Sequence, residues 1–145
     1  MNKKVACIRK EVWRRFKNVQ NIFFATSEGK RPCVRPVTMV HFANKFWVAT
    51  GSNDAKVKQI KNNKNIEFCL MFYKGKNTGY IRGSGVANIV RDKKTKKRLA
   101  NNIPYFKNYW KDAADPNFAL LNIVIRNIEY LKLGAYKVEK FSLDK

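Results

Sequence analysis

The chain has 145 residues, of which 45% are hydrophobic and 13% aromatic, enough for one globular domain over residues 1–145 and unlike a disordered or fibrous chain. Its 31 Lys and Arg residues against 10 Asp and Glu give a formal net charge of +21, which favours anionic partners. No stretch approaches the roughly 18 uninterrupted apolar residues of a membrane span, and the Lys-rich start leaves no room for a signal peptide, so we expect a cytoplasmic protein without membrane contact.

The first half of the chain predicts a helix, three strands and a second helix. An amphipathic helix is expected over residues 5–19, because apolar side chains recur there every three or four positions. Short polar turns then separate three predicted strands, over residues 21–27, 32–42 and 46–50. A short helix follows at once, with Ser52 as its N-cap and with Val57 and Ile60 on its apolar face.

The second half predicts further strands with basic helical segments between them. Residues 66–73 are a near-continuous apolar run, suited to a strand buried on both faces. The strand expected over residues 80–90 contains Gly83 and Gly85, which predict a bend or a bulge. The remaining predicted elements are a basic helix beginning at Asp92, a helix over residues 103–110 and a long strand over residues 118–133. Sequential strands with short turns and few helices between them favour an antiparallel, mainly β member of the α+β class.

Residues for acid–base, nucleophilic or metal chemistry do not form a pattern in this sequence. Cys7, Cys33 and Cys69 are odd in number and widely spaced, which predicts reduced thiols rather than a disulfide framework or a zinc site. The single histidine, His41, ends a predicted strand, and we interpret it as a structural residue. We therefore predict no catalytic side chain and no bound metal.

The stretch from Arg35 to Lys56 contains the most suggestive chemistry. Two hairpin strands end there beside a helix whose first turn offers N–H groups, the Ser52 hydroxyl and the Lys56 ammonium, a combination that suits a phosphate. The alternative is that Ser52 only caps the helix and that Arg35 and Lys56 are solvated cations. Spacing alone leaves both interpretations open.

Five short motifs occur together in an order typical of one superfamily: Asn21–Thr26, Arg35–Val37, Phe46–Thr50, Ser52 with Lys56 and Gln59–Ile60, and Ile81–Arg82 with Gly85–Ala87. Over residues 19–133 the chain resembles the FMN-binding split-barrel superfamily named after pyridoxamine 5′-phosphate oxidase, and within it the short, general-stress-protein-like branch. The resemblance implies an antiparallel split β-barrel with flanking short helices, which forms a homodimer and holds FMN in a groove between its subunits.

The resemblance also implies cofactor-binding roles for individual residues. They are phosphate contacts from Arg35 and Lys56, hydroxyl contacts from Thr50 and Ser52, backbone contacts to the flavin ring from Pro36 and Val37, and closure by the partner subunit through Tyr80 or the Tyr109–Trp110 pair. For these aromatic residues, ordinary core packing remains the alternative. The flavin itself would supply redox chemistry toward a small-molecule substrate or electron donor.

Two departures from the superfamily pattern narrow the expected function. Residues 135–145 lack the basic, aromatic C-terminal segment of true pyridoxamine phosphate oxidases, so vitamin-B6 oxidation is not expected. Leu131 follows Glu129 and Tyr130 where the short branch often has a tryptophan, which removes one aromatic contact. The alternatives that stay open are a deazaflavin or haem in the same fold, a barrel without cofactor, and a basic, non-enzymatic module that binds nucleic acid without sequence specificity.

Overall fold

The structure is a computed structural model that describes residues 2–143. Its elements in chain order are α1 (Lys3–Arg15), β1 (Val19–Glu28), β2 (Arg31–Phe42), β3 (Lys45–Gly51), α2 (Ala55–Asn62), β4 (Asn65–Lys74), β5 (Asn77–Ile89), α3 (Lys93–Asn102), the 3-10 turn η1 (Phe106–Asn108), β6 (Phe118–Leu131) and β7 (Glu139–Ser142). Within the described residues, no helix is both long and apolar enough to cross a membrane.

The strands close into an antiparallel ring. Neighbours pair in the order β3-β2-β1-β4-β5-β6, and the first half of β6 pairs back onto β3, with Phe118 opposite Gly51 and Ile123 opposite Phe46. Further along β6, the short strand β7 pairs with Asn127–Tyr130. This closed sheet with short flanking helices confirms the antiparallel, mainly β split barrel predicted from the sequence.

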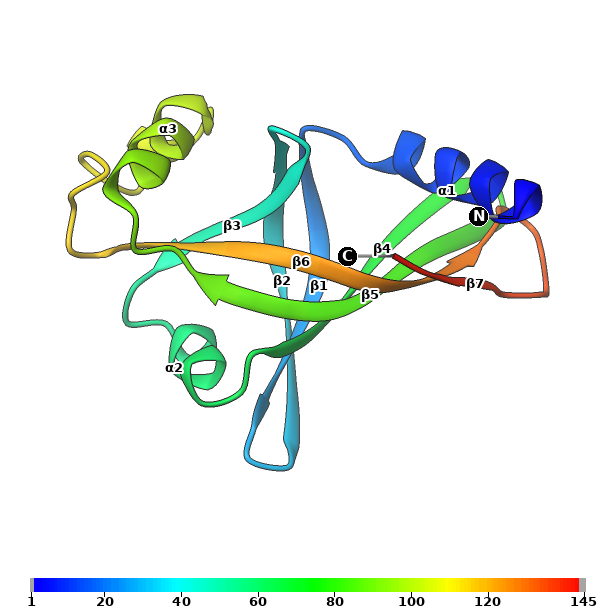
Figure 1. The fold of residues 1–145 in the computed structure, drawn as a ribbon, viewed down its shortest axis with the longest axis horizontal. Coiled ribbons are helices and arrows are strands. Elements are labelled where there is room, and N and C mark those ends of the chain that lie inside the picture. The colour runs from blue at the N-terminus through cyan, green and yellow to red at the C-terminus, as the bar shows by residue number, and fades with distance from the viewer. Residues whose placement is uncertain (1, 144–145) are drawn as a thin grey trace.

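The interior of the barrel is filled by a large apolar cluster to which α1 contributes one wall. Ile8 and Val12 of that helix and its C-cap residue Phe16 are buried against the barrel core, and Figure 1 shows α1 lying along one end of the sheet. Phe16 contacts Phe46 and Phe68 edge to face or tilted, with ring centroids 4.8 and 6.2 Å apart. Each fully buried side chain of this size contributes about 1.5–3 kcal/mol, so α1 is part of the core rather than an appendage.

A second apolar cluster lies on the outside of β3 and β6. Leu99 of α3, Phe106 of η1 and Trp47 of β3 are its buried centre, and α3 lies at the end of the barrel opposite α1 in Figure 1. Because the residues between α3 and β6 pack on this cluster, they are held against β3. This packing positions one wall of the candidate site.

Several local predictions were wrong. β4 is not buried on both faces, because Ile66, Phe68 and Leu70 point inward while Met71 and Tyr73 are exposed on the other face. The helix predicted over residues 103–110 is only the 3-10 turn η1, since α3 ends at Asn102 and Pro104 cannot donate a helical hydrogen bond.

Element boundaries differ as well. The first helix ends at Arg15 instead of residue 19, because the chain turns there into β1. The last long strand ends at Leu131 instead of residue 133, and the four-residue strand β7 was not predicted. The predicted bulge is confirmed: the pairing of β5 with β6 shifts register between Ser84 and Gly85. A Cβ atom at Gly85 would lie 1.9 Å from the Val124 carbonyl oxygen, so only glycine permits this close approach.

Candidate functional site

A groove opens where β2 and β3 separate. The two strands pair only near their hairpin, with Val40–Phe42 opposite Lys45–Trp47, and β3 then continues along β6 instead. The space between them is a cavity of about 300 Å³ that reaches the first turn of α2. The residues that line it are Pro36, Val37 and Thr38 of β2, Val48, Ala49, Thr50 and Gly51 of β3, Asp54 and Lys56 at the start of α2, and Tyr105, Tyr109 and Trp110 after α3.

The groove brings together most of the residues that the sequence suggested for a cofactor. Those that line it are Pro36, Val37, Thr50, Lys56 and Trp110. Arg35, Ser52 and Tyr80 are not among the lining residues. Two lining residues that the sequence did not single out, Asp54 and Tyr105, have unusual polar environments.

At one end of the groove, three hydrogen-bond donors converge on the carboxylate of Asp54. Its Oδ2 atom accepts hydrogen bonds from the Thr50 hydroxyl at 2.6 Å, from the Gly51 N–H at 3.2 Å and from the Lys56 ammonium at 2.9 Å. The hydrogen bond from Thr50 and the charge of Lys56 hold the pKa of the Asp54 carboxyl below its ordinary value.

Gly51 and Lys56 both favour the position of the Asp54 carboxylate, one by leaving space and the other by its charge. A Cβ atom at residue 51 would lie 3.0 Å from Asp54 Oδ1, tighter than ordinary side-chain contacts, so a glycine there gives the carboxylate room. The Lys56 side chain is only 13% exposed, so its ammonium relies on a counter-ion rather than on bulk water.

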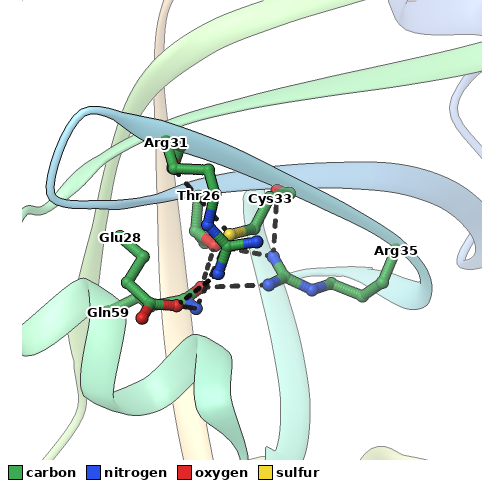
Figure 2. Close-up of polar contacts among 6 residues, drawn as sticks. All are labelled: Thr26, Glu28, Arg31, Cys33, Arg35 and Gln59. Atoms are coloured by element: carbon green, nitrogen blue, oxygen red, sulfur yellow. Dashed lines mark hydrogen bonds and ion pairs between the residues drawn. The ribbon is translucent and has the colours of Figure 1, made fainter.

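Arg35, predicted as a phosphate ligand, is instead held by a polar cluster between β1, β2 and α2. Its guanidinium donates to Thr26 Oγ1 at 2.7 Å and to Gln59 Oε1 at 3.0 Å, and Figure 2 shows it directed toward these two side chains. Thr26 and Gln59 are both buried, and Gln59 also contacts Glu28, which pairs with Arg31 at 2.8 Å. The cluster fixes α2 against the β1–β2 hairpin.

Ser52 was predicted to cap α2, and this prediction was wrong. The N-cap residue is Asp54. The Ser52 hydroxyl donates to the Pro116 carbonyl at 2.7 Å, and the Ser52 N–H donates to the Asn117 carbonyl at 3.0 Å. Ser52 therefore ties the loop between β3 and α2 to the turn that precedes β6.

Aromatic side chains form the wall of the groove opposite the barrel core. Trp110 packs on Phe106 and Phe118, with centroid distances of 5.3 and 5.1 Å, and its Nε1 donates to the Asn117 carbonyl at 3.1 Å. Tyr109 lies beside Trp110 and is 70% exposed. Both residues line the groove of their own chain, although the sequence had suggested that they reach a partner subunit.

The hydroxyl of Tyr105 is buried in this wall without a hydrogen-bond partner among the described residues. Burial, together with the neighbouring Tyr109, raises the pKa of Tyr105 to about 12, so the hydroxyl is a proton donor at neutral pH. A buried donor without a partner costs about 1–3 kcal/mol. A ligand with an acceptor atom in the groove would remove that cost.

Tyr80 lies on the outer face of β5, away from the groove of its own chain. It is half-buried, with Met71 of β4 opposite it on one side and Leu131 of β6 on the other. His41 is also outside the groove, where its ring stacks on Phe46 at 4.4 Å, and burial lowers its pKa. Within residues 2–143, no group of three metal-ligating side chains forms.

A weak sequence signal could have pointed to Asp54, because an acidic residue immediately before a helix is a common N-cap. That signal predicts a capping carboxylate, however, and not one turned back toward Thr50. Tyr105 had no signal at all, since its segment was predicted to be helical and its hydroxyl becomes buried only through packing on β3.

Comparison with known proteins identifies the family of the chain. Residues 8–141 match the profile of the family described as "Pyridoxamine 5'-phosphate oxidase like". The chain belongs to this family. Its members commonly bind a flavin, and some bind haem. No curated protein sequence matches the chain significantly.

Solved structures share the fold of this family member. A NimC/NimA family protein from Clostridium acetobutylicum is 24% identical, with 92% of this chain and 91% of that chain covered and a TM-score of 0.76. General Stress Protein 26 from Bacillus anthracis is 22% identical, with 94% and 98% covered and a TM-score of 0.73. A haem-binding protein from Mycobacterium smegmatis is 10% identical, with 86% and 53% covered and a TM-score of 0.69.

The lining residues fit a flavin mononucleotide in two respects and conflict with it in one. The Thr50, Gly51 and Lys56 donors suit a phosphate, and Tyr105, whose buried hydroxyl has no partner among the described residues, is one of the aromatic residues that line the groove. The conflict is the Asp54 carboxylate, which occupies the phosphate donors and carries the same sign of charge as a phosphate.

Proposed function

We propose that the protein is an FMN-binding flavoprotein that acts as an oxidoreductase on a small-molecule substrate or electron donor. Lys56, Thr50 and the Gly51 N–H would hold the phosphate, while the Pro36–Val37 backbone and Trp110 would contact the flavin. When bound, FMN supplies hydride or single-electron transfer. The protein's own residues bind the phosphate, orient the ring and exclude water from one of its faces.

The observation that supports this proposal best is that one groove combines a polar, cationic end with an aromatic wall. Three hydrogen-bond donors converge on one oxygen at the α2 end, and an aromatic wall with the unpartnered Tyr105 hydroxyl lies along its length. A phosphate joined to a planar, hydrogen-bonding ring matches both parts. Inorganic phosphate would contact only the donors at the α2 end and not the aromatic wall.

A homodimer is part of the proposal. The outer face of neighbouring strands carries large apolar side chains that water contacts: Phe23 of β1 is 49% exposed, Val34 of β2 is 69% exposed, and Met71 and Tyr73 of β4 are 40% and 65% exposed. Phe23 lies opposite Cys69, two residues before Met71, so the patch crosses strands. A second copy packed on this face would cover the patch and bring its Tyr80 toward the groove, as expected from the family resemblance.

The proposal places the protein in the cytoplasm. Cys7, Cys33 and Cys69 are all free thiols in the structure, and reduced cysteines are typical of that compartment. The proposal includes no metal and no catalytic side chain, because the redox chemistry belongs to the flavin.

The test is the visible absorption spectrum of the purified protein before and after incubation with FMN, followed by removal of unbound cofactor. Retained flavin bands with a stoichiometry of one FMN per chain support the proposal. A deazaflavin spectrum or a haem Soret band in the protein as isolated would replace FMN by that cofactor. A colourless protein that retains no added FMN contradicts the proposal.

A separate cavity favours nucleic acid as the second candidate ligand. About 710 Å³ in volume, it lies between α3 and the segment that follows η1, and its charged lining includes Arg91, Lys93, Lys96, Lys97 and Lys107 against one acid, Asp112. Such a basic surface attracts phosphate backbones without reading their sequence. Gel-shift titrations at rising salt test it, because affinity that persists at physiological salt would favour a dedicated function over the non-specific attraction we expect.

A further inference from the structure

The Asp54 carboxylate occupies the hydrogen-bond donors at the α2 end of the groove. The Thr50 hydroxyl, the Gly51 N–H and the Lys56 ammonium all donate to one atom, Asp54 Oδ2. A phosphate oxygen at the same place would receive the same charge-assisted hydrogen bonds. The site therefore has the chemistry of a phosphate site but already holds a carboxylate.

A phosphate and this carboxylate compete for the same donors. The Thr50 hydroxyl has one proton and the Gly51 amide has one N–H, so each serves one strong acceptor at a time. Lys56 is nearly buried and forms its ion pair with Asp54 at 2.9 Å. Two anions side by side at this ammonium would also repel each other, so a phosphate must displace Asp54.

The Asp54 side chain has a second hydrogen-bonding position available, at the N-terminus of α2. Asp54 is the N-cap residue of α2, with the extended backbone of that position (φ −63°, ψ 146°), yet its side chain makes no capping hydrogen bond. Aspartate is among the preferred N-cap residues, because its carboxylate accepts from the N–H groups of the first helical turn. Rotation of the side chain alone would move the carboxylate from the groove to the end of the helix.

We propose that Asp54 sets the affinity of the groove for phosphate-bearing ligands: such a ligand binds by displacing the Asp54 carboxylate from Thr50, Gly51 and Lys56, and the freed carboxylate then caps α2. Asp54 is thus a specificity-determining residue. It keeps the site closed to inorganic phosphate and other small anions, and it admits a ligand whose ring gains further contacts along the groove. The choice of FMN as that ligand rests on the proposed function.

The experiment compares Asp54→Asn with the wild-type chain by titration with FMN and with riboflavin, which has the same ring and no phosphate. We expect the Kd for FMN to fall by at least about 10-fold in D54N, since the like charge is removed and a neutral amide oxygen competes more weakly for the donors, while the Kd for riboflavin stays the same. Asp92→Asn is the matched control, because Asp92 is the N-cap of α3 and lies outside the groove. It should leave both affinities unchanged.

Two outcomes with flavin would overturn the proposal. One is an unchanged FMN affinity in D54N, and the other is an equal gain for riboflavin, which would mean that Asp54 does not act through the phosphate. Asp54→Ser guards against an effect of the asparagine itself, since serine also caps helices but is too short to compete for Lys56. It should show the same selective gain for FMN.

Inorganic phosphate separates this proposal from the flavin function. If no variant binds FMN, the Asp54 proposal is tested by comparing the thermal unfolding temperatures of D54N and the wild type with and without inorganic phosphate. Stabilisation of D54N by phosphate, without stabilisation of the wild type, supports the role of Asp54 while the flavin function fails. If phosphate stabilises neither protein, or both equally, the Asp54 proposal fails on its own.

Discussion

The guanidinium of Arg35 donates a hydrogen bond to Gln59 Oε1 at 3.0 Å and thereby joins β2 to α2. Gln59 lies one helical turn after Lys56, so this bond also fixes how Lys56 faces the groove. Arg35 thus supports the phosphate end of the site without lining it. Its role is to position α2.

Removal of Arg35 should therefore destabilise the fold. In Arg35→Ala, the buried oxygens of Thr26 and Gln59 lose a charged donor, and we expect the free energy of unfolding to fall by about 2 kcal/mol. Arg31→Ala is the control on the same strand, because its ion pair with Glu28 is exposed and worth roughly 0–1 kcal/mol. Urea denaturation of both variants measures the difference, and equal stabilities would contradict a structural role for Arg35.

Lys56→Ala should act differently, on ligand affinity more than on stability. It removes the one cation among the described residues that line the groove, and we expect FMN binding to weaken by about 2 kcal/mol, or roughly 30-fold. Flavin fluorescence titration measures this. The comparison is made at a temperature where both variants are folded. If FMN affinity falls more in R35A than in K56A, Arg35 rather than Lys56 is the main phosphate ligand.

Tyr105→Phe should stabilise the protein when no ligand is bound. The substitution removes a buried hydroxyl without a partner, and we expect the free energy of unfolding to rise by about 1 kcal/mol. The same change should weaken FMN binding, because a donor to the ring is lost. Tyr136→Phe is the control, since Tyr136 is fully exposed. A loss of stability in Y105F would show that the hydroxyl has a partner in solution, such as a bound water.

Acid should weaken the fold in part through Asp54. The folded-state pKa of this carboxyl lies below its ordinary value of 3.8, so the folded chain holds the proton less tightly than the unfolded chain. Its contribution to stability is present above that ordinary value and is lost as pH falls through the folded-state pKa. Thermal unfolding from pH 6 to pH 2 should accordingly show a smaller loss in D54N than in the wild type. Parallel curves would mean that the contacts of Asp54 do not persist in solution.

The exposed apolar patch predicts the effect of a charge at its centre. Met71→Glu should convert a dimer to a monomer in light scattering, with the dimer Kd raised by at least about 30-fold, because burial of an unpaired carboxylate costs about 2 kcal/mol or more. Tyr136→Glu, on the exposed segment after β6, should leave the dimer intact. A wild-type chain that is monomeric at all concentrations would contradict the predicted dimer.

The fold and the general place of the site could be predicted from the amino-acid sequence. Strand-like runs separated by short polar turns indicated β1 to β3, the glycine pair indicated the bulge in β5, and the stretch from Arg35 to Lys56 indicated the groove. These signals are local, because they depend on residues close together in the chain and on the periodicity of strands and helices. For that reason, the elements predicted from them are present in the structure.

Which side chains face one another depends on tertiary packing and could not be predicted. Arg35 is drawn away from the groove by Gln59, the Ser52 hydroxyl is taken by the Pro116 carbonyl, and Tyr105 loses its access to water when its segment packs on β3. Thr50 and Lys56, two of the four side chains assigned to the cofactor, donate to Asp54. A hydrogen bond is made by whichever partner packing brings within about 3 Å, and packing depends on residues far apart in the chain, so no local pattern contained these pairings.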